Sequence, residues 1–282
     1  MRIGYQGIRG AYSEAAIYQH HGKDVKAVGF DTFEDVFEAV KKGKVDLGCL
    51  PFENTIAGSV TTNYDLLLKE NVFVISEIFF KISHNLLSRK GNKLANIKAA
   101  YSHPHSLEQC RDFLRKYRIK PVPEYDTAGA AKLVKERNKK NEAAIASKLC
   151  AEIYGLDIIR EGIETNQYNT TKFFVFAKKN NVPKDLKKEK TSIALKAKHY
   201  PGSLVNCLQR LSKNGINMTK LESRPIPENP WEYVFYVDFI GGVDDENVKL
   251  ALNEMETTAT FIKILGSYPK GRKEQETGVG AK

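Results

Sequence analysis

The stretch Asn166-Gln-Tyr-Asn-Thr-Thr-Lys-Phe-Phe-Val-Phe176 places two hydroxyl groups and a cation directly before a short apolar run. Aromatic and β-branched residues suit a pleated surface, so the run from Phe173 to Phe176 predicts a buried strand. That strand would carry Thr170, Thr171 and Lys172 to the edge of a sheet, where α/β proteins bind small ligands. Taken alone, the stretch favours a plain polar turn before a core strand, so the rest of the chain has to distinguish the two.

The composition is that of a globular protein with room for two domains. Of the 282 residues, 41% are hydrophobic and 28% are charged, as in ordinary globular domains. No apolar run is long enough to cross a bilayer, and Met1 to Gln6 runs into a strand-like pattern without the apolar core of a signal peptide. The four cysteines are far apart and form no CxxC pair. We therefore expect buried free thiols, a cytoplasmic location and no membrane partner.

The formal net charge of +10 is compatible with nucleic-acid binding, but its pattern argues against that function. The lysines are scattered, and the densest group, Lys178 to Lys190, has the composition of a solvated linker. The sequence contains no RNP-type motif and no paired Cys and His. A modest positive field attracts a small polyanionic substrate equally well, so we expect a small anionic ligand and no nucleic acid.

A glycine loop follows the first predicted strand. Residues 3–5 predict that strand, and Ser13 and Glu14 are good helix-starting residues after the loop. The glycine spacing does not fit the dinucleotide fingerprint, because Gln6 stands at a place that requires glycine, and NAD binding is not expected. A helix N-terminus with close backbone approach still suits a carboxylate ligand.

Polar turns recur where predicted strands end and helices begin. They lie at Gln6–Gly10, Glu53–Ser59, Ser102–Ser106 and Asp126–Thr127. Because strand carboxyl ends and helix N-termini collect on one edge of each sheet, a polar cleft rich in donors is expected. For Glu53–Ser59, a capped loop and one wall of a polar pocket remain equal alternatives. His103 and His105 lack a third placed ligand, which favours capping or hydrogen bonding over a metal.

The pattern changes after the lysine-rich linker. Strands are predicted at 192–197, 216–223, 231–239 and 261–265, with helices at 203–211 and 244–257. The resulting order, βαββαβ, is the ferredoxin-like arrangement, and a unit of this size can fold alone. The glycine-, lysine- and glutamate-containing tail has the composition of a disordered segment.

Ordered segments along essentially the whole chain resemble the prephenate dehydratases of phenylalanine biosynthesis, a family that includes the plant arogenate dehydratases. The matching segments are Gly7–Glu14, Pro51–Ser59, Ser102–His105, Asp126–Ala131 and Ala143–Ser147. Pro201–Leu204 and Glu222–Pro225 resemble the effector-binding segments of the ACT domain in these enzymes.

The resemblance implies an α/β fold: a two-lobed, type II periplasmic-binding-like catalytic region followed by a ferredoxin-like ACT domain. The catalytic domain would span residues 1–177, with lobes of about 1–78 plus 160–177 and 79–159. A linker at 178–190 would precede the ACT domain at 191–270, and 271–282 would form a disordered tail.

The resemblance also implies the reaction. Prephenate would lose its ring hydroxyl as water and its ring carboxylate as carbon dioxide, which gives phenylpyruvate. Aromatisation supplies the driving force, so no cofactor and no metal is expected. The family's Thr-Arg-Phe motif falls on Thr171-Lys172-Phe173, with Thr171 as the catalytic threonine. A threonine hydroxyl is a very weak acid, so Thr171 is expected to donate a hydrogen bond to the departing oxygen.

The same resemblance assigns the remaining site residues. Substrate would be bound by Lys172, Phe173, Thr170, Asn54, Thr55, Ser13, His103 and Thr127. L-Phenylalanine would bind as a feedback inhibitor at Gly202, Ser203, Leu204, Asn217, Glu222, Ser223 and Arg224. Homodimers or homotetramers would form through the ACT domain, which would also bury exposed strand edges.

Two alternatives stay open. Arogenate differs from prephenate by an amine in place of a keto group, so an arogenate dehydratase fits the same residues. Lys172 stands where the family has arginine, and a lysine offers a point charge instead of a bidentate fork. This departure favours, as the second alternative, a non-catalytic carboxylate or amino-acid sensor on the same fold.

Overall fold

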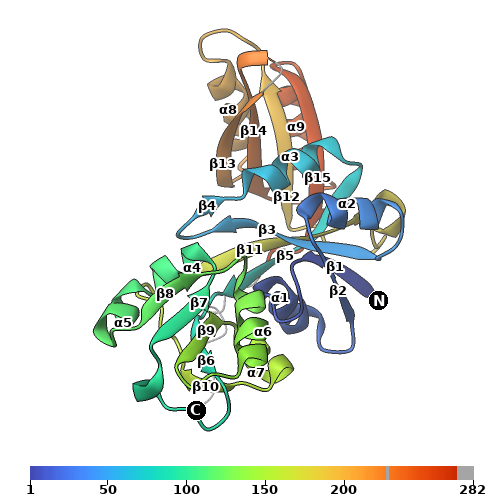
Figure 1. The fold of residues 1–282 in the computed structure, drawn as a ribbon. Helices are drawn as coiled ribbons and strands as arrows, with labels where there is room; N and C mark the ends of the chain where they lie inside the picture. Colours follow the sequence, from blue (N-terminus) through green and yellow to red (C-terminus); the bar gives the residue numbers. More distant parts are fainter. Residues whose placement is uncertain (227–228, 272–282) are drawn as a thin grey trace, which may run out of the picture. The chain divides into compact units, whose positions relative to one another are not determined.

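The computed structural model describes residues 1–226 and 229–271, so the predicted tail lies outside the described residues from position 272 onward. Contacts divide the chain into two compact units. The first comprises Met1–Ala39, Cys49–Ser59 and Phe79–Phe173, and the second Val40–Gly48, Val60–Ile78 and Phe174–Lys282. Three strands contribute residues to both units: β3 (Leu47–Asn54), β5 (Val72–Lys81) and β11 (Thr170–Lys178), all labelled in Figure 1.

The first unit opens with two parallel strands joined by a helix. β1 (Arg2–Gln6) pairs with β2 (Lys26–Phe30), and α1 (Tyr12–His21) connects them. α2 (Phe33–Lys41) follows, and the Thr32 hydroxyl at its start accepts a hydrogen bond from Asp35 N at 3.1 Å. β3 lies beside β1 and turns back into β4 (Gly58–Ser59). The glycine loop between β1 and α1 is therefore where the sequence predicts it, whereas β2 was not among the predicted strands.

A second sheet in the first unit has the strand order β10-β6-β9-β7-β8. Its strands are β6 (Asn85–Ser88), β7 (Ala99–Ser102), β8 (Lys120–Pro123), β9 (Glu142–Ala146) and β10 (Asp157–Arg160). The intervening helices are η1 (Leu94–Asn96), α4 (Pro104–Gln109), α5 (Arg111–Lys116), α6 (Thr127–Arg137) and α7 (Lys148–Tyr154). β7 runs parallel to β8 and β9, while β6 runs antiparallel to β9 and β10, so the sheet is mixed.

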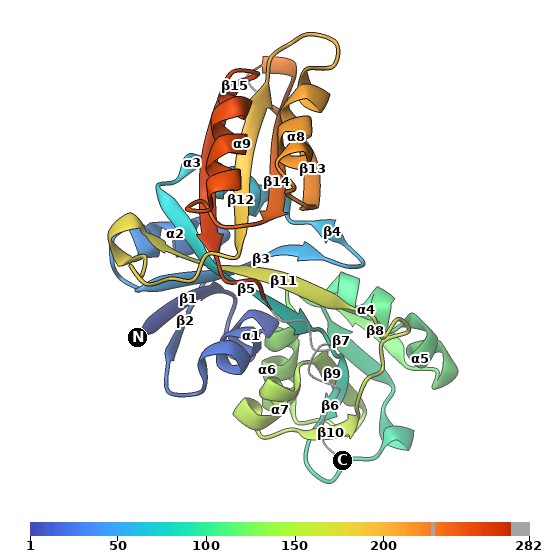
Figure 2. The same ribbon diagram turned by 180° about the vertical axis from the view of Figure 1, so that it is seen from behind.

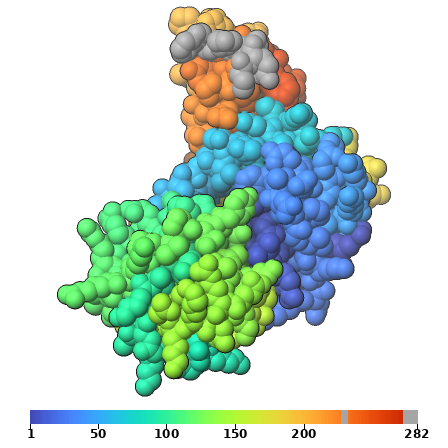
Figure 3. All heavy atoms as spheres, viewed as in Figure 1, coloured from blue at the N-terminus to red at the C-terminus, as the bar shows by residue number. Residues whose placement is uncertain are grey.

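Helices cover both faces of this mixed sheet, as the alternation of strands and helices predicts. One core packs under α6 and α7 around Leu87 and Val134, and the other packs under α4 and α5 around Leu114 and Ile145. α6 and α7 form much of the light-green surface in Figure 3. Every residue of β9 is buried, which fits a strand covered on both faces. The apolar character of this strand is therefore explained by its central position.

The second unit contains the predicted βαββαβ order. Its elements are β12 (Lys190–Ala197), α8 (Ser203–Lys213), β13 (Met218–Ile226), β14 (Asn229–Ile240), α9 (Glu246–Glu256) and β15 (Ala259–Tyr268). The unit also contains α3 (Thr61–Lys69), η2 (Lys179–Asn181) and the part of β5 up to Ile78. β12 pairs antiparallel with β14 and β15, and β13 pairs antiparallel with β14. The ferredoxin-like fold predicted for this segment is confirmed.

The two faces of the second unit's sheet are covered differently. α8 and α9 pack on one face against Ile193, Val237 and Phe239. α3 lies on the opposite face, as the front and back views in Figures 1 and 2 show, and its Tyr64 ring stacks 4.9 Å from that of Tyr236. β15 also pairs in parallel with β5 through Gly266, where a Cβ would overlap a backbone carbonyl of β5. Residues from positions 60–78 are thus integral to this unit.

Two expectations from composition can be compared with these elements. All four cysteines are free and buried, as predicted. Burial raises the pKa of the Cys150 thiol to about 11, so this thiol is not a reactive thiolate at neutral pH. In the described part of the chain, no helix combines the length and the apolar character that a membrane crossing requires.

Candidate active site

Thr171 lies at the start of β11, where the predicted polar turn meets the apolar strand. Its side chain is buried, and its Oγ1 accepts a hydrogen bond from Asn54 Nδ2 at 2.9 Å. The Asn54 amide is oriented by its own turn, because Asn54 Oδ1 accepts from the backbone N–H of Ile56 and of Ala57, both at 2.9 Å. Nδ2 must therefore point to Thr171 as a donor. This leaves the Thr171 hydroxyl hydrogen for a different acceptor.

Asn169 connects the Asn54–Thr171 pair to a second group of polar residues. Its Oδ1 accepts from Asn54 Nδ2 at 2.7 Å, and its Nδ2 donates to Gln109 Oε1 at 3.0 Å. The side chain is buried, and the backbone carbonyl accepts from Ile82 N at 2.8 Å. A buried amide with all of these groups satisfied has one orientation, so Asn169 fixes the position of Asn54.

The polar chain continues from Gln109 to His84 and Tyr12. Gln109 Oε1 lies 2.6 Å from His84 Nε2, and Tyr12 Oη lies 2.7 Å from His84 Nδ1. Gln109 Oε1 already accepts from an amide, so His84 Nε2 carries hydrogen and Nδ1 accepts from Tyr12. Burial lowers the pKa of His84 and raises that of Tyr12, which keeps both groups neutral. Hydrogen bonds between uncharged side chains therefore connect Tyr12 to Thr171. We call these six residues the neutral relay: Tyr12, His84, Gln109, Asn169, Asn54 and Thr171.

Sequence reasoning found only the Asn54 and Thr171 end of the neutral relay. The residues that it missed are Tyr12, His84, Gln109 and Asn169. A signal was present for His84 and Asn169, because each is a polar residue directly before a strand and is now found to be buried. Partners 25 to 115 positions apart, as in the His84–Gln109 and Asn54–Asn169 bonds, leave no local periodicity that would predict them.

Lys172 points away from Thr171. Side chains of successive strand residues alternate between the two faces, and Lys172 Nζ forms an ion pair with Glu53 Oε2 at 3.0 Å. Glu53 and Asn54 alternate in the same way along β3, so the charged pair and the hydroxyl–amide pair occupy opposite faces. Lys172 is 8% exposed. The structure therefore places the predicted substrate cation beside a carboxylate, while Phe173 shares the face of Thr171.

Thr55 and Thr170 join two polar loops of the first unit. Thr55 Oγ1 donates to Tyr168 O at 2.7 Å and accepts from Thr170 N at 3.0 Å. Thr55 N also donates to Thr170 O at 3.0 Å. These bonds fasten the loop after β3 to the segment before β11, so both predicted threonines hold Asn54 and Thr171 in one place.

The remaining predicted substrate residues lie at helix N-termini of the first unit. Ser13 is in the first turn of α1, His103 is the N-cap of α4, and Thr127 begins α6. The capping role expected for His103 is confirmed, since its Nδ1 accepts from His105 N at 3.3 Å, and burial lowers its pKa. At the predicted polar turn Asp126–Thr127, it is Asp126 that caps α6, accepting from Gly129 N at 2.6 Å. None of the described hydrogen bonds joins Ser13, His103 or Thr127 to Thr171.

The glycine loop is held against α7. Gly10 O accepts from Ser147 Oγ at 2.7 Å and from Cys150 Sγ at 3.1 Å. Gly10 has a φ of +94°, and a Cβ there would lie 2.5 Å from Cys150 Sγ, so only glycine fits. Glu14 Oε2 accepts from Gly10 N at 2.5 Å, which places a carboxylate of the protein itself at the start of α1. The expectation that this helix end binds a substrate carboxylate is weakened accordingly.

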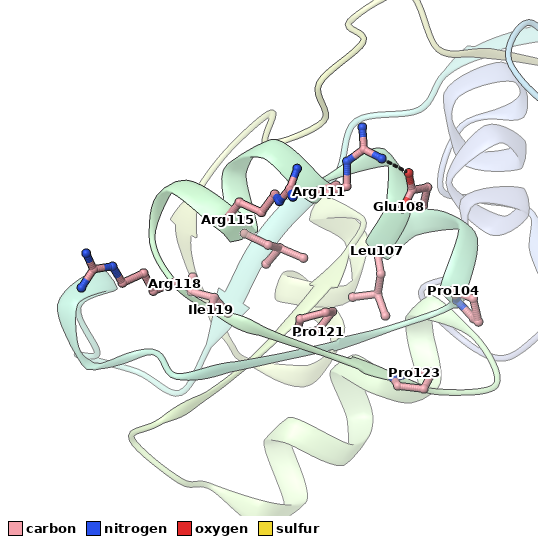
Figure 4. Close-up of a pocket in the computed structure, with 10 residues that line it drawn as sticks. Pro104, Leu107, Glu108, Arg111, Arg115, Arg118, Ile119, Pro121 and Pro123 are labelled. Atoms are coloured by element: carbon pink, nitrogen blue, oxygen red, sulfur yellow. Dashed lines mark hydrogen bonds and ion pairs between the residues drawn. The ribbon is translucent and has the colours of Figure 1, made fainter.

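A surface pocket of about 530 Å³ lies elsewhere in the first unit, between α4, α5 and β8 (Figure 4). Its floor is formed by leucine, isoleucine and proline side chains. Arg111, Arg115 and Arg118 lie around it, and Arg111 pairs with Glu108 at 2.7 Å. None of the residues predicted for the active site lines this pocket. The candidate site is therefore defined by the neutral relay and not by the pocket.

The residues predicted for the effector site are divided in the second unit. Gly202 precedes α8 with a φ of +83°, Ser203 begins that helix, and Leu204 packs on the core. Glu222 and Arg224 lie on one face of β13, while Ser223 lies on the other. Arg224 is engaged by Asp65 of α3, with Nη2 2.9 Å from Oδ2. Asn217 lies just before β13, and its backbone carbonyl accepts from Ile240 N at 2.9 Å.

Comparisons with known proteins identify the class of protein to which this α/β fold belongs. A profile of the family described as Prephenate dehydratase matches residues 3–181. The arogenate dehydratase/prephenate dehydratase 2 of Arabidopsis thaliana is 38% identical over 278 residues, covering 95% of this chain and 73% of the relative. The chain belongs to the prephenate dehydratase family.

Two solved structures extend the likeness over nearly the whole chain. Prephenate dehydratase from Arthrobacter aurescens, solved in complex with L-Phe, has a TM-score of 0.86 and 28% identity, covering 96% of this chain and 90% of that one. A protein described as GqqA, a novel type of quorum quenching acylase, has a TM-score of 0.87 and 33% identity, covering 95% and 98%. The predicted fold class, an α/β region followed by a ferredoxin-like unit, is thus the fold of prephenate dehydratases.

Proposed function

We propose that this protein converts prephenate to phenylpyruvate, water and carbon dioxide in L-phenylalanine biosynthesis. One observation carries the proposal within this family: Thr171 Oγ1 accepts from Asn54 Nδ2 at 2.9 Å, and Asn54 cannot rotate. The threonine hydrogen is therefore available for the departing ring oxygen. A pre-oriented donor of this kind stabilises charge that develops in the transition state.

The bond changes follow from the substrate. The ring C–O bond and the bond to the ring carboxylate break, the carboxylate leaves as carbon dioxide, and its electron pair completes the aromatic ring. The hydroxide that departs gains one proton, supplied in the net reaction by solvent, to become water. Thr171 would donate a hydrogen bond to that oxygen, and Asn54 would stabilise the partial charge that appears on Thr171 Oγ1. Because the relay is neutral throughout, it adds no charge that would oppose loss of hydroxide.

The other predicted residues complete the substrate site in this proposal. We assign Ser13, His103, Thr127 and Phe173 to positioning of the substrate, and Thr55 and Thr170 to holding the two loops together. Lys172 would act at longer range, because Glu53 shares its charge. An arginine at this position could bind a substrate carboxylate through two hydrogen bonds, which a lysine cannot do. Neutral hydrogen-bond donors would therefore contribute more to positioning the substrate.

We further propose feedback inhibition by L-phenylalanine at an ACT domain of residues 191–270. It would follow a linker at 178–190 and a catalytic domain at 1–177, with dimers or tetramers formed through the ACT domains. The relative that was solved with L-Phe supports the effector, and the βαββαβ order supports the domain. Gly202, Ser203, Leu204, Asn217, Glu222 and Ser223 remain the proposed effector contacts.

One experiment tests the function and its alternatives together. Purified protein is offered prephenate and arogenate in parallel, and products are read by ultraviolet absorbance and mass. We expect phenylpyruvate from prephenate. Phenylalanine from arogenate as the faster reaction would support the arogenate alternative, and the name of the Arabidopsis relative includes both activities. Binding of prephenate without turnover would establish the sensor instead.

An acylase assay on the same preparation addresses the other activity named among the solved relatives. Hydrolysis through a threonine nucleophile needs a general base on the hydroxyl. The hydrogen bond that Thr171 receives comes from an amide donor, which cannot accept its proton. We therefore expect no acylase activity that depends on Thr171.

A further inference from the structure

Helix α3 is fastened to the C-terminal sheet by a forked ion pair. Arg224 of β13 donates from Nε to Asp65 Oδ2 at 3.2 Å and from Nη2 to the same oxygen at 2.9 Å. Tyr236 on the neighbouring strand faces the same carboxylate at 3.5 Å. All of these residues belong to the second compact unit. The two side chains are 38% and 43% exposed, and a forked arginine–carboxylate contact restricts orientation as well as distance, so it links β13 to α3.

A second contact holds the C-terminal end of the same helix. Lys263 Nζ of β15 donates to the backbone carbonyls of Leu67 at 3.2 Å, Leu68 at 2.6 Å and Glu70 at 2.8 Å. The last carbonyls of a helix have no partner within the helix, and one ammonium group has three hydrogens to give them. Burial lowers the pKa of Lys263, as expected for a cation that has left water.

Aromatic contacts fill the space between these two polar contacts. The Tyr64 ring of α3 stacks on Tyr236, and Lys220 Nζ lies 5.3 Å from the centre of the Tyr64 ring. Figures 1 and 2 show α3 on the face of the sheet opposite α8 and α9. α3 is thus held by the sheet at its middle, at its end and along its apolar side.

The other end of α3 leads directly into the candidate active site. α3 begins at Thr61, and β4 ends two residues earlier at Ser59. In β4, Gly58 pairs with Asn54 and Ser59 pairs with Glu53. Asn54 is the residue that donates to Thr171 Oγ1. Val60 alone therefore separates α3 from the strand pair that contains this amide.

We infer that Arg224 is a positioning residue, which passes the effector state of the C-terminal sheet through Asp65 and α3 to Asn54. The inference rests on the proposed function and replaces the expectation that Arg224 is an effector ligand. Glu222 and Ser223 are its neighbours on β13, so an effector that shifts this strand shifts Arg224 with it. The coupling is the difference in free energy of the Arg224–Asp65 contact between the two effector states.

The decisive variant is Asp65→Asn, which keeps the side-chain shape and removes the charge that Arg224 grips. We expect prephenate turnover without effector to stay within about twofold, and the phenylalanine concentration for half inhibition to rise about threefold to fivefold, the scale of a partly exposed ion pair. Phenylalanine binding, measured by calorimetry, should persist. Glu256→Gln, which removes an exposed carboxylate from α9 in the same unit, is the matched control and should respond as the wild type does.

The charge reversal Asp65→Arg with Arg224→Asp separates positioning from ligand binding. A positioning pair works in either polarity, so the double variant should recover phenylalanine inhibition that Asp65→Arg alone has lost. An effector ligand does not, because a carboxylate at position 224 would repel the effector carboxylate. Loss of phenylalanine binding in the double variant, or wild-type inhibition in Asp65→Asn, overturns the inference.

Hydrogen exchange of residues 53–69 tests the coupling without turnover. Saturating phenylalanine should change exchange in this segment of the wild-type protein and leave it unchanged in Asp65→Asn. A wild-type protein that does not turn over prephenate contradicts the proposed function, whereas this exchange result still decides the coupling. Unchanged exchange in the wild type, or an absence of phenylalanine binding, contradicts the inference itself.

Discussion

Two buried polar networks, one in each unit, differ in formal charge. In the first unit the neutral relay joins hydroxyl, amide and imidazole groups without a formal charge. In the second, Lys190 Nζ and Glu77 Oε2 pair at 2.7 Å with side chains 7% and 1% exposed. Ser192 continues this network by donating to Asp238 Oδ1 at 2.5 Å. A fully hydrogen-bonded neutral network holds its groups in one orientation without a net charge, while a buried charge pair adds a large cost of separation.

The formal charge of each network suits what that network has to do. A site that must receive and release an oxygen with developing charge benefits from donors that remain neutral and oriented. A junction between β5 and β12 benefits from charges, because separating them exposes each to an apolar surrounding. Substitutions in one network or the other should therefore affect stability and turnover differently.

The largest effect is expected from Glu77→Gln, which among the described residues leaves Asp238 as the carboxylate paired with buried Lys190, at 4.0 Å. Removing one partner of a buried ion pair costs about 3–5 kcal/mol of unfolding free energy, and Asp238 should keep the loss near the lower end. Chemical denaturation measures it. Adding Lys190→Met to the same chain should restore most of the stability; a double variant as unstable as the single one would refute the charge-pair explanation.

Thr171→Ala comes next and acts on the neutral relay alone. We expect phenylpyruvate formation to fall by at least about 100-fold, the scale of a positioned proton donor, with unchanged thermal unfolding. Thr171→Ser is the matched control, because it retains the hydroxyl and should keep more activity than alanine. Near-normal turnover in Thr171→Ala would remove Thr171 from the mechanism.

A smaller effect is expected from Asn169→Ala, which separates Gln109 from Asn54 while both remain in place. The variant loses two hydrogen bonds, and the one that orients Asn54 is worth about 1–1.5 kcal/mol, or about a tenfold decrease in kcat. KM should change little, because Asn169 positions the donor and is not proposed to touch substrate. A rise in KM at unchanged kcat would instead place Asn169 in substrate binding.

The smallest effect concerns pH. Burial lowers the pKa of His84 in the folded state below the unfolded value of about 6.5. A lowered pKa stabilises the fold while the imidazole is neutral, so this contribution is present above the unfolded pKa and is lost as the pH falls through the folded one. Unfolding free energy should therefore fall from pH 7 to pH 5. His84→Gln should flatten part of that slope, and an unchanged slope would show that His84 does not contribute.

Much of the fold was predictable from local pattern. The βαββαβ order, the strand at Phe173–Phe176 and the cap at Asp126 all follow from periodicity or capping chemistry within a few residues. β2 escaped because its residues are only partly buried, and its short sequence has no clear alternation. The prediction missed β2 for a physical reason. An edge strand needs little apolar surface, so its sequence shows little of the hydrophobic pattern that predicts a strand.

The candidate site was predictable only in part. Thr171 and Asn54 lie in segments that resemble a known family, and each sits at a strand end. The Asn54–Asn169 hydrogen bond joins positions 115 apart, and the Arg224–Asp65 ion pair joins positions 159 apart. Contacts over such separations leave no local pattern in the sequence. The opposite orientation of Lys172 depends on which face the strand turns inward, and a one-residue change of register would reverse it.

Gene fusion and truncation assume that a domain is one continuous segment of the chain. The second unit does not meet this assumption, because α3 comes from an earlier part of the sequence. A fragment that carried only residues 191–270 would leave out Tyr64, Asp65 and Glu77. Tyr236 and Tyr268 would then face solvent or another chain. Transplanting the C-terminal ferredoxin-like fold onto a different protein would therefore require grafting residues 60–78 as well, a segment that lies more than a hundred positions upstream.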